Sequence, residues 1–279
     1  MENGKLYLVA TPIGNLDDIT YRAVETLKSV DIIAAEDTRH SLKLLNHLQI
    51  SKPLISYHRH NEDVKTDLLI EKLLKGENIA LITDAGTPAI SDPGEEIVKQ
   101  AIKNEIEIIP IPGACALINA LICSGMDTKE FSFFGFLPLN KKLRKNKFEE
   151  IKNENKTIII YEAPHRLNNT LKDILNEIGD VNIVLAREIT KIHEEFIRGR
   201  ISEIINKTEE IKGEIILILE GNKKNDVKNN IKEFLNDMSL DEHYEFYKKQ
   251  NIDKKEIIKK IAKDRGVNKN EIYIKLLDK

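Results

Sequence analysis

The segment at residues 83–94 carries the residue types best suited to binding a small cofactor. It follows an apolar, β-branched run that predicts a strand, and ligands in open α/β sheets bind just beyond the carboxyl ends of the strands. Asp84 offers a carboxylate, and Gly86 and Thr87 offer backbone groups that a ligand can approach closely. These groups suit a cofactor with a cationic centre and free hydroxyls, although an ordinary strand-to-helix turn remains the alternative interpretation.

The end of the same segment argues against a phosphate ligand. Asp92 is expected to be the N-cap of a helix, with Pro93 in its first position and Glu95 three residues after the cap. Carboxylates then occupy the positive end of the helix dipole, where a phosphate would otherwise bind. The segment also contains neither GxGxxG nor GxxxxGK(S/T), which disfavours NAD, FAD and ATP as cofactors.

A second candidate contact lies at residues 110–116, where Gly113 opens a predicted helix that has no acidic residue in its first turn. The free N–H groups of such a helix start can receive a carboxylate. Small side chains at Ala114 and Ala116 would let a ligand reach the backbone, but they suit tight packing of the helix on a sheet equally well. Both interpretations remain open.

Polar clusters follow several other predicted strands. They lie at residues 10–18, 36–39, 58–62, 161–166 and 187–188. Each taken alone fits a salt-bridged helix start, and Asp18 is expected to cap a helix that begins near Ile19. Their repeated position beyond apolar runs favours one shared cleft. The histidines lack the spacing of metal ligands, so they are assigned to hydrogen bonding or acid/base work, and no metal is expected.

The elements that position these clusters are predicted from apolar runs that alternate with amphipathic segments. The first strands are expected at residues 6–10, 31–35, 79–83 and 106–110. A second set is expected at residues 131–136, 157–161, 183–187, 194–198 and 215–219. The first set predicts an α/β fold with a largely parallel sheet, and the closely spaced later strands predict a mixed sheet. The expected domains are 1–112, 113–222 and a helical region at 223–279.

Helical patterns rich in lysine replace the strands toward the C-terminus, at residues 253–262 and 268–277. Asp253 is expected to cap the first helix, Gly266 to stop it, and Asn268 to cap the second. Two short helices joined in this way make an appendage that resembles a helix-turn-helix. Such a pair serves either as a packing unit or as a nucleic-acid contact, and its shape alone does not decide between them.

Chain length and net charge limit the class of protein. A chain of 279 residues has room for roughly two domains, and its net charge of −3 argues against binding nucleic acid over the whole surface. Any RNA contact must therefore be local, and a dense basic run consists of Lys141, Lys142, Arg144, Lys145 and Lys147. That run is equally consistent with a solvated helix face.

Cysteine usage and hydropathy add two further expectations. Cys115 and Cys123 lie in one apolar, helix-like stretch without a metal-binding pattern, so reduced structural thiols are expected. The polar start of the chain and the lack of a long apolar run predict a cytoplasmic protein without a leader or membrane span.

Several motifs occur in an order that resembles one known family. The matching blocks are residues 9–16, 35–39, 58 with 61–62, 84–88 with 91–94, 161–166 and 186–188. Together they resemble the ribosomal RNA small subunit methyltransferase I family of the tetrapyrrole methylase superfamily. The resemblance extends from about residue 6 to residue 221 and, more loosely, through the helical tail.

The resemblance implies a fold and a reaction. It implies two α/β domains with S-adenosylmethionine in the cleft between them, a homodimer, and 2'-O-methylation of a cytidine in the decoding region of 16S ribosomal RNA within the small ribosomal subunit. The cofactor-binding residues implied are Pro12, Asp84, Ala85, Gly86, Thr87, Gly113, Ala114 and Ala116. One departure is Ala114-Cys115, where relatives commonly carry Pro-Ser, so a side-chain hydroxyl contact would be lost.

The implied reaction needs a group that accepts the proton of the ribose hydroxyl. The candidates are Glu36, His58 and Glu62. The candidate RNA contacts are Arg39, Lys141, Lys142, Arg144, Lys145, Arg166 and Arg187. No DNA and no membrane partner is expected.

Two other functions remain as alternatives. A methylase of a tetrapyrrole-like small molecule or of a modified protein residue would use the same cofactor cleft but would need an enclosed apolar trough. A non-catalytic RNA-binding or ribosome assembly factor, with the helical tail as its reader, would not bind S-adenosylmethionine.

Overall fold

The computed structural model describes residues 2–208, 211–222, 235, 238–249 and 252–277. The chain forms two compact units, one made of residues 1–151 with 157–220 and the other of 152–156 with 221–279. Both β-sheets lie in the first unit, so the finer division into 1–112, 113–222 and 223–279 stays a prediction.

The N-terminal sheet has five parallel strands in the order β3-β2-β4-β1-β5. The strands are β1 (Leu6–Val9), β2 (Ile32–Ala35), β3 (Leu54–Ser56), β4 (Ile79–Ile82) and β5 (Ile108–Ile111). Every residue of β2 and of β4 is buried, as expected when helices cover both faces of a parallel sheet. The predicted parallel sheet is confirmed, although the short edge strand β3 was not expected.

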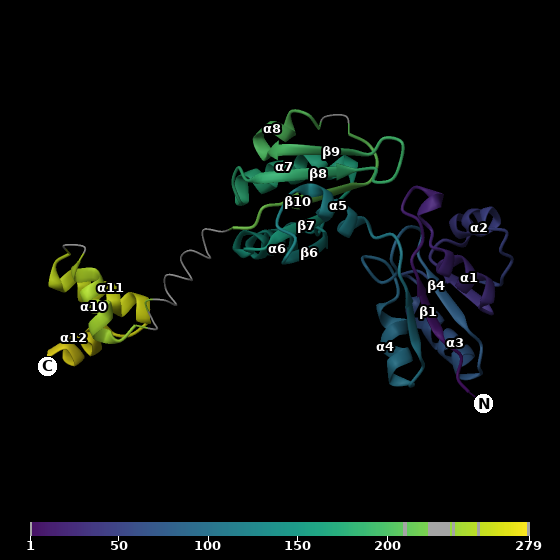
Figure 1. The fold of residues 1–279 in the computed structure, drawn as a ribbon, viewed down its shortest axis with the longest axis horizontal. Helices are drawn as coiled ribbons and strands as arrows, with labels where there is room; N and C mark the ends of the chain where they lie inside the picture. Colours follow the sequence, from purple (N-terminus) through teal and green to yellow (C-terminus); the bar gives the residue numbers. More distant parts are fainter. Residues whose placement is uncertain (1, 209–210, 223–234, 236–237, 250–251, 278–279) are drawn as a thin grey trace. The chain divides into compact units, whose positions relative to one another are not determined.

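Helices cover both faces of this sheet (Figure 1). They are α1 (Tyr21–Ser29) and α2 (Thr38–His47) on one face, and α3 (Glu62–Leu74) and α4 (Glu95–Lys103) on the other. The prediction that Asp18 caps a helix near Ile19 is wrong. Asp18 ends a short 3₁₀ helix, η1 (Leu16–Asp18), and the Thr20 hydroxyl caps α1 by accepting a hydrogen bond from the Ala23 N–H at 3.1 Å.

The second sheet is mixed, as predicted, with the order β6-β7-β10-β8-β9. Its strands are β6 (Phe131–Phe136), β7 (Thr157–Glu162), β8 (Asn182–Arg187), β9 (Glu195–Arg200) and β10 (Ile215–Leu219). β6 and β7 pair in parallel, whereas the other neighbours pair antiparallel. The short connection between β8 and β9 imposes this direction, because a parallel crossover needs a longer segment.

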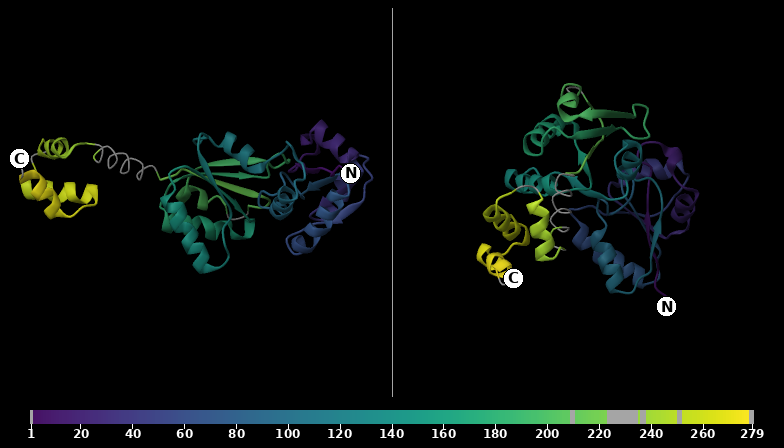
Figure 2. Two further views of the ribbon diagram at one scale, coloured as in Figure 1. Left: turned by 90° about the horizontal axis from the view of Figure 1, so that it is seen from below. Right: turned by 60° about the vertical axis from the view of Figure 1, so that its left-hand side comes forward.

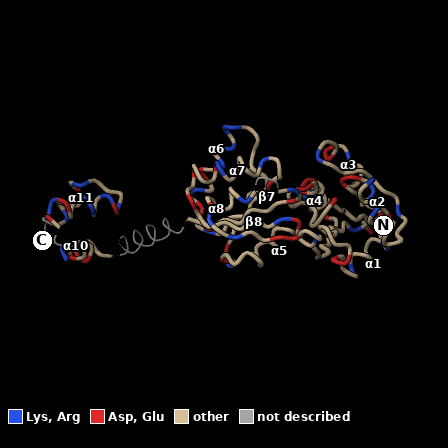
Figure 3. Tube along the Cα trace, turned by 90° about the horizontal axis from the view of Figure 1, so that it is seen from above, with Lys and Arg blue, Asp and Glu red and all other residues tan. Residues whose placement is uncertain are grey.

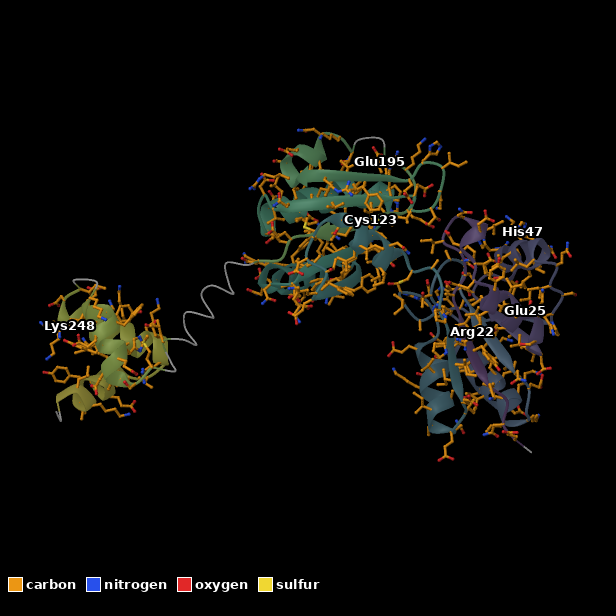
Figure 4. All side chains as sticks on the ribbon, viewed as in Figure 1. Arg22, Glu25, His47, Cys123, Glu195 and Lys248 are labelled. Carbon is orange, nitrogen blue, oxygen red and sulfur yellow. The ribbon has the colours of Figure 1, made fainter. Side chains whose placement is uncertain are left out.

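The two faces of the second sheet are covered by different helices (Figure 2). α5 (Ala116–Ser124) packs on one face, and α6 (Lys141–Asn153), α7 (Pro164–Glu177) and α8 (Ile201–Ile205) pack on the other. Both cysteines are free thiols, and the exposed Cys123 lies near the end of α5 (Figure 4).

The second unit contains α10 (Leu240–Lys248), α11 (Lys254–Arg265) and α12 (Lys269–Leu277). A small core of its own is formed by Ile257, Ile258, Ile261, Ala262 and Ile272. Asp253 caps α11 and Gly266 ends it with φ +65°, as predicted, although α11 continues past residue 262. Among the residues described, no helix is both long and apolar enough to cross a membrane.

A buried histidine holds these helices together. His243 is 0% exposed, and its Nδ1 accepts a hydrogen bond from Arg265 Nε at 3.2 Å. Asp264 Oδ2 lies 3.5 Å from His243 Nε2 and accepts a hydrogen bond from the Tyr247 hydroxyl at 2.6 Å. Burial, together with the positive charge of Arg265, lowers the pKa of His243 and outweighs the opposing effect of Asp264.

The second unit is therefore expected to lose stability in mild acid. Because the pKa of His243 is lower in the folded unit than in the unfolded chain, the stability is fully present above about pH 6.5 and is lost as the pH falls from that value through the lower pKa of the folded unit. Hydrogen exchange of the α11 amides in the full chain, corrected for intrinsic rates, should show protection falling by up to roughly tenfold per pH unit. His243→Gln is the control without a titrating ring, and equal pH dependence in both proteins would contradict this assignment.

Candidate functional site

A cavity of about 440 Å³ opens in the first unit, beyond the ends of strands from both sheets. Its lining includes the segment at 83–92 after β4, the residue after β2, the start of α5 and the residues that join β7 to α7. A cavity of this volume fits a small-molecule ligand. Polar segments that lie far apart in the sequence thus meet at one site.

The topology of the first sheet explains where the cavity lies. β1 and β4 are neighbours, but the helices that follow them, α1 and α4, pack on opposite faces of the sheet. Ligands bind at such a switch point because the two connections diverge and leave a crevice. The loops after β1 and β4 are tied together there, since the backbone of Thr11 and that of Gly86 exchange hydrogen bonds of 2.9 and 3.1 Å.

Only glycine fits easily at position 86. Its φ is +85°, a conformation that other residues adopt at a cost, and a Cβ atom would lie 3.1 Å from a methyl group of Ile13. Gly113 plays a comparable part at the start of α5, because a Cβ there would lie 2.8 Å from the Ala10 Cβ. Both glycines therefore allow the segments around the cavity to approach β1 closely.

The prediction that Asp92 is the N-cap of α4 is wrong, and the observed cap leaves Asp92 with another role. The helix begins at Glu95 with Gly94 as its N-cap, and the Gly94 N–H donates a hydrogen bond to Glu62 Oε1 at 3.0 Å. Glu62 therefore satisfies the helix end from outside the loop. Ala89 and Ser91 have positive φ values of +65° and +66°, strained conformations that shape the loop, and Asp92 lines the cavity.

Asp92 belongs to a cluster of acidic residues at the ends of β2 and β4. The register pairs Ala35 with Ile82, so the next residues, Glu36 and Thr83, lie side by side, and the Thr83 hydroxyl donates to Glu36 Oε2 at 2.9 Å. Burial and the nearby negative charge of Glu36 raise the pKa of Asp92 to about 6, against the opposing hydrogen bond with Thr83. Asp92, which the sequence predicts to be a helix cap, is therefore a residue of the cavity wall.

The predicted cofactor residues are only partly gathered in the cavity. Asp84, Ala85, Gly86, Thr87 and Ala116 line it. The described residues that line the cavity do not include Pro12, Gly113 or Ala114. Ala114 contributes indirectly, because its carbonyl accepts a hydrogen bond from the Thr87 hydroxyl at 3.1 Å and so fixes the loop against the start of α5.

Of the three predicted catalytic residues, Glu36 alone is among the described residues that line the cavity. Besides the Gly94 N–H, Glu62 accepts the Tyr57 hydroxyl at 3.1 Å, so its carboxylate is engaged in structure. The His58 backbone N–H donates to the Asn61 side chain at 2.8 Å, and the His58 ring nitrogen Nδ1 is buried without a partner.

The predicted RNA-binding arginines all have carboxylate partners. Arg39 pairs with Asp37 at 3.1 Å, Arg166 with Glu162 at 3.1 Å, and Arg187 with Glu195 at 2.7 Å. The Arg39 side chain is 89% exposed, whereas those of Arg166 and Arg187 are 20% and 24% exposed. Arg39 is thus the arginine of these three that is most open to a large ligand.

The basic run falls on α6, where Figure 3 shows basic residues along the helix. Lys141, Lys142 and Lys145 are exposed. Arg144 is instead 16% exposed, and it pairs with Asp173 at 2.9 Å and donates to the Thr170 hydroxyl at 2.8 Å. The geometry therefore gives Arg144 a structural role and leaves the three lysines on the surface.

The other wall of the cavity is largely apolar. It includes Ile13, Ile90, Phe136, Tyr161, Ile189 and Ile216. Tyr161 packs edge-on against Phe136 with 5.6 Å between ring centroids, and burial raises its pKa, which keeps the phenol neutral. Acidic groups thus face an apolar wall. Among the described residues, no cluster of histidine, cysteine and carboxylate side chains is arranged to hold a metal ion.

Comparison with known proteins gives one consistent result. The sequence signature described as Tetrapyrrole (Corrin/Porphyrin) Methylases matches residues 5–205. A relative from Halalkalibacterium halodurans called Ribosomal RNA small subunit methyltransferase I is 50% identical, covering 98% of this chain and 94% of the relative. A relative of the same name from Bacillus subtilis is 48% identical, covering 97% and 93%.

Solved structures with a similar fold are much more distant in sequence. A diphthine synthase matches with a TM-score of 0.62 and 13% identity, covering 78% of this chain and 90% of that one. A uroporphyrin-III C-methyl transferase from Thermus thermophilus complexed with S-adenyl homocysteine matches with a TM-score of 0.56 and 16% identity, covering 78% and 97%. At these identities the likeness concerns the fold alone.

The raised pKa of Asp92 predicts that its carboxylate destabilises the folded protein at neutral pH. Because the folded value of about 6 exceeds the unfolded one, the penalty is absent below pH 4 and grows as the pH rises toward 6. Asp92→Asn should therefore raise the melting temperature by roughly 2 to 6 °C at pH 8 and leave it unchanged near pH 4. Thermal unfolding followed by circular dichroism tests this expectation, and a variant that is no more stable at pH 8 would contradict it.

Proposed function

Because the chain belongs to the tetrapyrrole methylase family and to its ribosomal RNA small subunit methyltransferase I branch, we propose that it methylates 16S ribosomal RNA. The proposed reaction transfers a methyl group from S-adenosylmethionine to the 2'-hydroxyl of a cytidine in the decoding region. The observation that carries the proposal is 50% identity to a relative of that name over 98% of this chain. Identity of this extent includes the cavity and the helical unit alike.

The cavity residues fit S-adenosylmethionine. Asp84 supplies negative charge for a cationic sulfur and acceptor oxygens for ribose hydroxyls, while the apolar wall suits a flat ring. The start of α5 has no acidic residue in its first turn, so its N–H groups can receive a carboxylate. When bound, the cofactor supplies a methyl group already activated on a sulfonium. A related fold solved with S-adenyl homocysteine is consistent with this assignment.

The chain's own residues then have two tasks. They align the ribose oxygen with the methyl group inside the cavity, and this alignment removes much of the entropic barrier. They also accept the hydroxyl proton. Of the candidates Glu36, His58 and Glu62, only Glu36 is among the described residues at the cavity wall, so we keep it as a member of the group of side chains that handles this proton.

The RNA is proposed to contact surfaces outside the cavity. Lys141, Lys142 and Lys145 on α6 are exposed and suited to phosphates, as is the exposed guanidinium of Arg39. Arg166 and Arg187 remain candidates with carboxylate partners of their own. We further propose that the substrate is the RNA within the small ribosomal subunit and that the enzyme acts as a homodimer in the cytoplasm.

Purified small subunits that lack the modification provide the direct test. Incubation with labelled S-adenosylmethionine should label the RNA, and nuclease digestion with nucleoside mass spectrometry should detect 2'-O-methylcytidine. Cofactor binding without RNA labelling would instead favour a methylase of a small molecule or of a modified protein residue. Failure to bind the cofactor at all would favour an RNA-binding assembly factor.

Neutralising the lysines of α6 should weaken RNA binding through electrostatics. A Lys141→Gln/Lys142→Gln/Lys145→Gln variant is expected to reduce the slope of log K against log salt by up to about 2 to 3, since each phosphate contact contributes about 0.7 to 0.9. The measurement is RNA binding by filter retention at several salt concentrations.

A control variant of equal net charge separates local contacts from total charge. The exposed residues Lys75, Lys103 and Lys129 lie outside α6 and outside α2, which carries Arg39, and their replacement by glutamine should leave the slope unchanged. Equal slopes for the α6 variant and the wild type would eliminate α6 as an RNA contact.

A further inference from the structure

We propose that Asp92 accepts the proton of the target hydroxyl, and that Thr83 and Glu36 hold that proton through a chain of hydrogen bonds. The inference rests on the proposed function and deepens it, because it names the acceptor and the two residues that position it. All three side chains belong to residues that line the same cavity. They come from the ends of two adjacent strands, β2 and β4, and from the strained loop that follows β4.

The hydroxyl of Thr83 lies between two carboxylates. It donates to Glu36 Oε2 at 2.9 Å, and it also lies close enough to the Asp92 carboxylate to lower the pKa of that group. A hydroxyl has one hydrogen to donate and two lone pairs that accept, so it cannot donate to both carboxylates at once. When both acids are ionised, one of them therefore lacks this donor, and both negative charges stand at the wall of the same cavity.

One added proton resolves this conflict. A protonated Asp92 can donate to Thr83 Oγ1, while Thr83 continues to donate to Glu36, so that each oxygen in the chain has a partner. The repulsion between the two carboxylates disappears in the same step. The arrangement thus favours proton uptake from a neighbouring group, which is what methylation of a hydroxyl requires.

The proposed step balances in atoms and charge. The target O–H bond breaks, its proton joins a lone pair of the Asp92 carboxylate, and its electron pair stays on oxygen and forms the new bond to the methyl carbon. The bond from that carbon to the sulfonium of the methyl donor breaks, and its electron pair remains on sulfur. The products are a methyl ether, a neutral thioether and a protonated Asp92, which later releases its proton to water.

Charged groups around Asp92 set the pH range in which it can act. Glu36 and Asp84 at the ends of β2 and β4 raise its pKa, whereas the Arg59 guanidinium after β3 lowers it. On the opposite wall Tyr161 is neutral, since burial raises its pKa. With burial as the largest influence, the pKa of Asp92 is about 6, so the carboxylate is mostly ionised at neutral pH and still basic enough to accept a proton.

The test combines kinetics with a measurement that does not need turnover. Asp92→Asn should lower kcat for methylation of small subunits by roughly 100-fold or more, as loss of a general base does, with the cofactor Kd within about threefold of the wild type.

The wild-type rate should fall as the pH drops through about 6. Glu36→Gln should shift this acidic limb of the pH profile to lower pH, because the substitution removes the charge that raises the pKa of Asp92. Thr83→Val should lower kcat about tenfold, whereas Thr83→Ser should restore it.

The second measurement is a ¹³C NMR titration of the Asp92 carboxyl in the cofactor-free protein. Its midpoint should lie near 6 and fall in Glu36→Gln. A titration midpoint at the usual value for an aspartate, unchanged in Glu36→Gln, would overturn the proposal. This holds whether or not the wild-type protein labels RNA. A wild-type protein that shows the raised, coupled titration but labels no RNA would refute the proposed function, whereas RNA labelling together with an ordinary midpoint would refute the assignment of Asp92 alone.

Three kinetic outcomes would also overturn the proposal. One is an Asp92→Asn enzyme that keeps its kcat and its acidic limb. Another is loss of cofactor binding in that variant, which would make Asp92 a cofactor ligand. The third is equal behaviour of Thr83→Val and Thr83→Ser, which would leave the hydroxyl without a role. Melting temperatures measured for every variant exclude loss of fold as the cause.

Discussion

The cavity depends on the pair of backbone hydrogen bonds that joins Thr11 to Gly86. These bonds hold the loop after β4 against the end of β1, and they are possible because the backbone at position 86 adopts φ +85° without a side chain. From there the loop reaches α5, where the Thr87 hydroxyl is bonded to the Ala114 carbonyl. The ends of both sheets are thereby fixed around one space, and the acidic and apolar walls face each other across it.

The carboxylates of the cavity wall lower the stability of the folded protein, and the rest of the structure offsets this loss. Asp92 is half-buried beside other carboxylates, and neutralising its charge would favour the folded state. The surrounding structure compensates, because Glu62 takes over the capping of α4 and the core strands β2 and β4 are fully buried. Side chains that would otherwise serve the helix end are thus free to line the cavity.

Much of the fold was predictable from the sequence, whereas the site was predictable only in part. Long β-branched runs identified the strands of both sheets, but β3 has only three residues, all partly exposed, and gives too weak a pattern. Asp92 followed by Pro93 looked like a helix start, and only the tertiary contact from Glu62 to the Gly94 N–H moved the cap. His58 and Glu62 were placed near the cleft by their positions after strands, yet side-chain direction, which sequence spacing does not give, keeps both out of its lining.

The contacts of Arg144, whose side chain is 16% exposed, have a mechanical consequence for the lysine-bearing helix. Arg144 ties α6 to Asp173 and Thr170 on α7, and Thr170 in turn is hydrogen-bonded to Glu162, which lines the cavity. A shift of α6 relative to α7 would have to break these hydrogen bonds, so they restrain the position of α6 relative to the cavity wall. If RNA binds the lysines of α6, as proposed above, this restraint sets the distance from the bound RNA backbone to the cavity, and that distance would limit which nucleotide can enter.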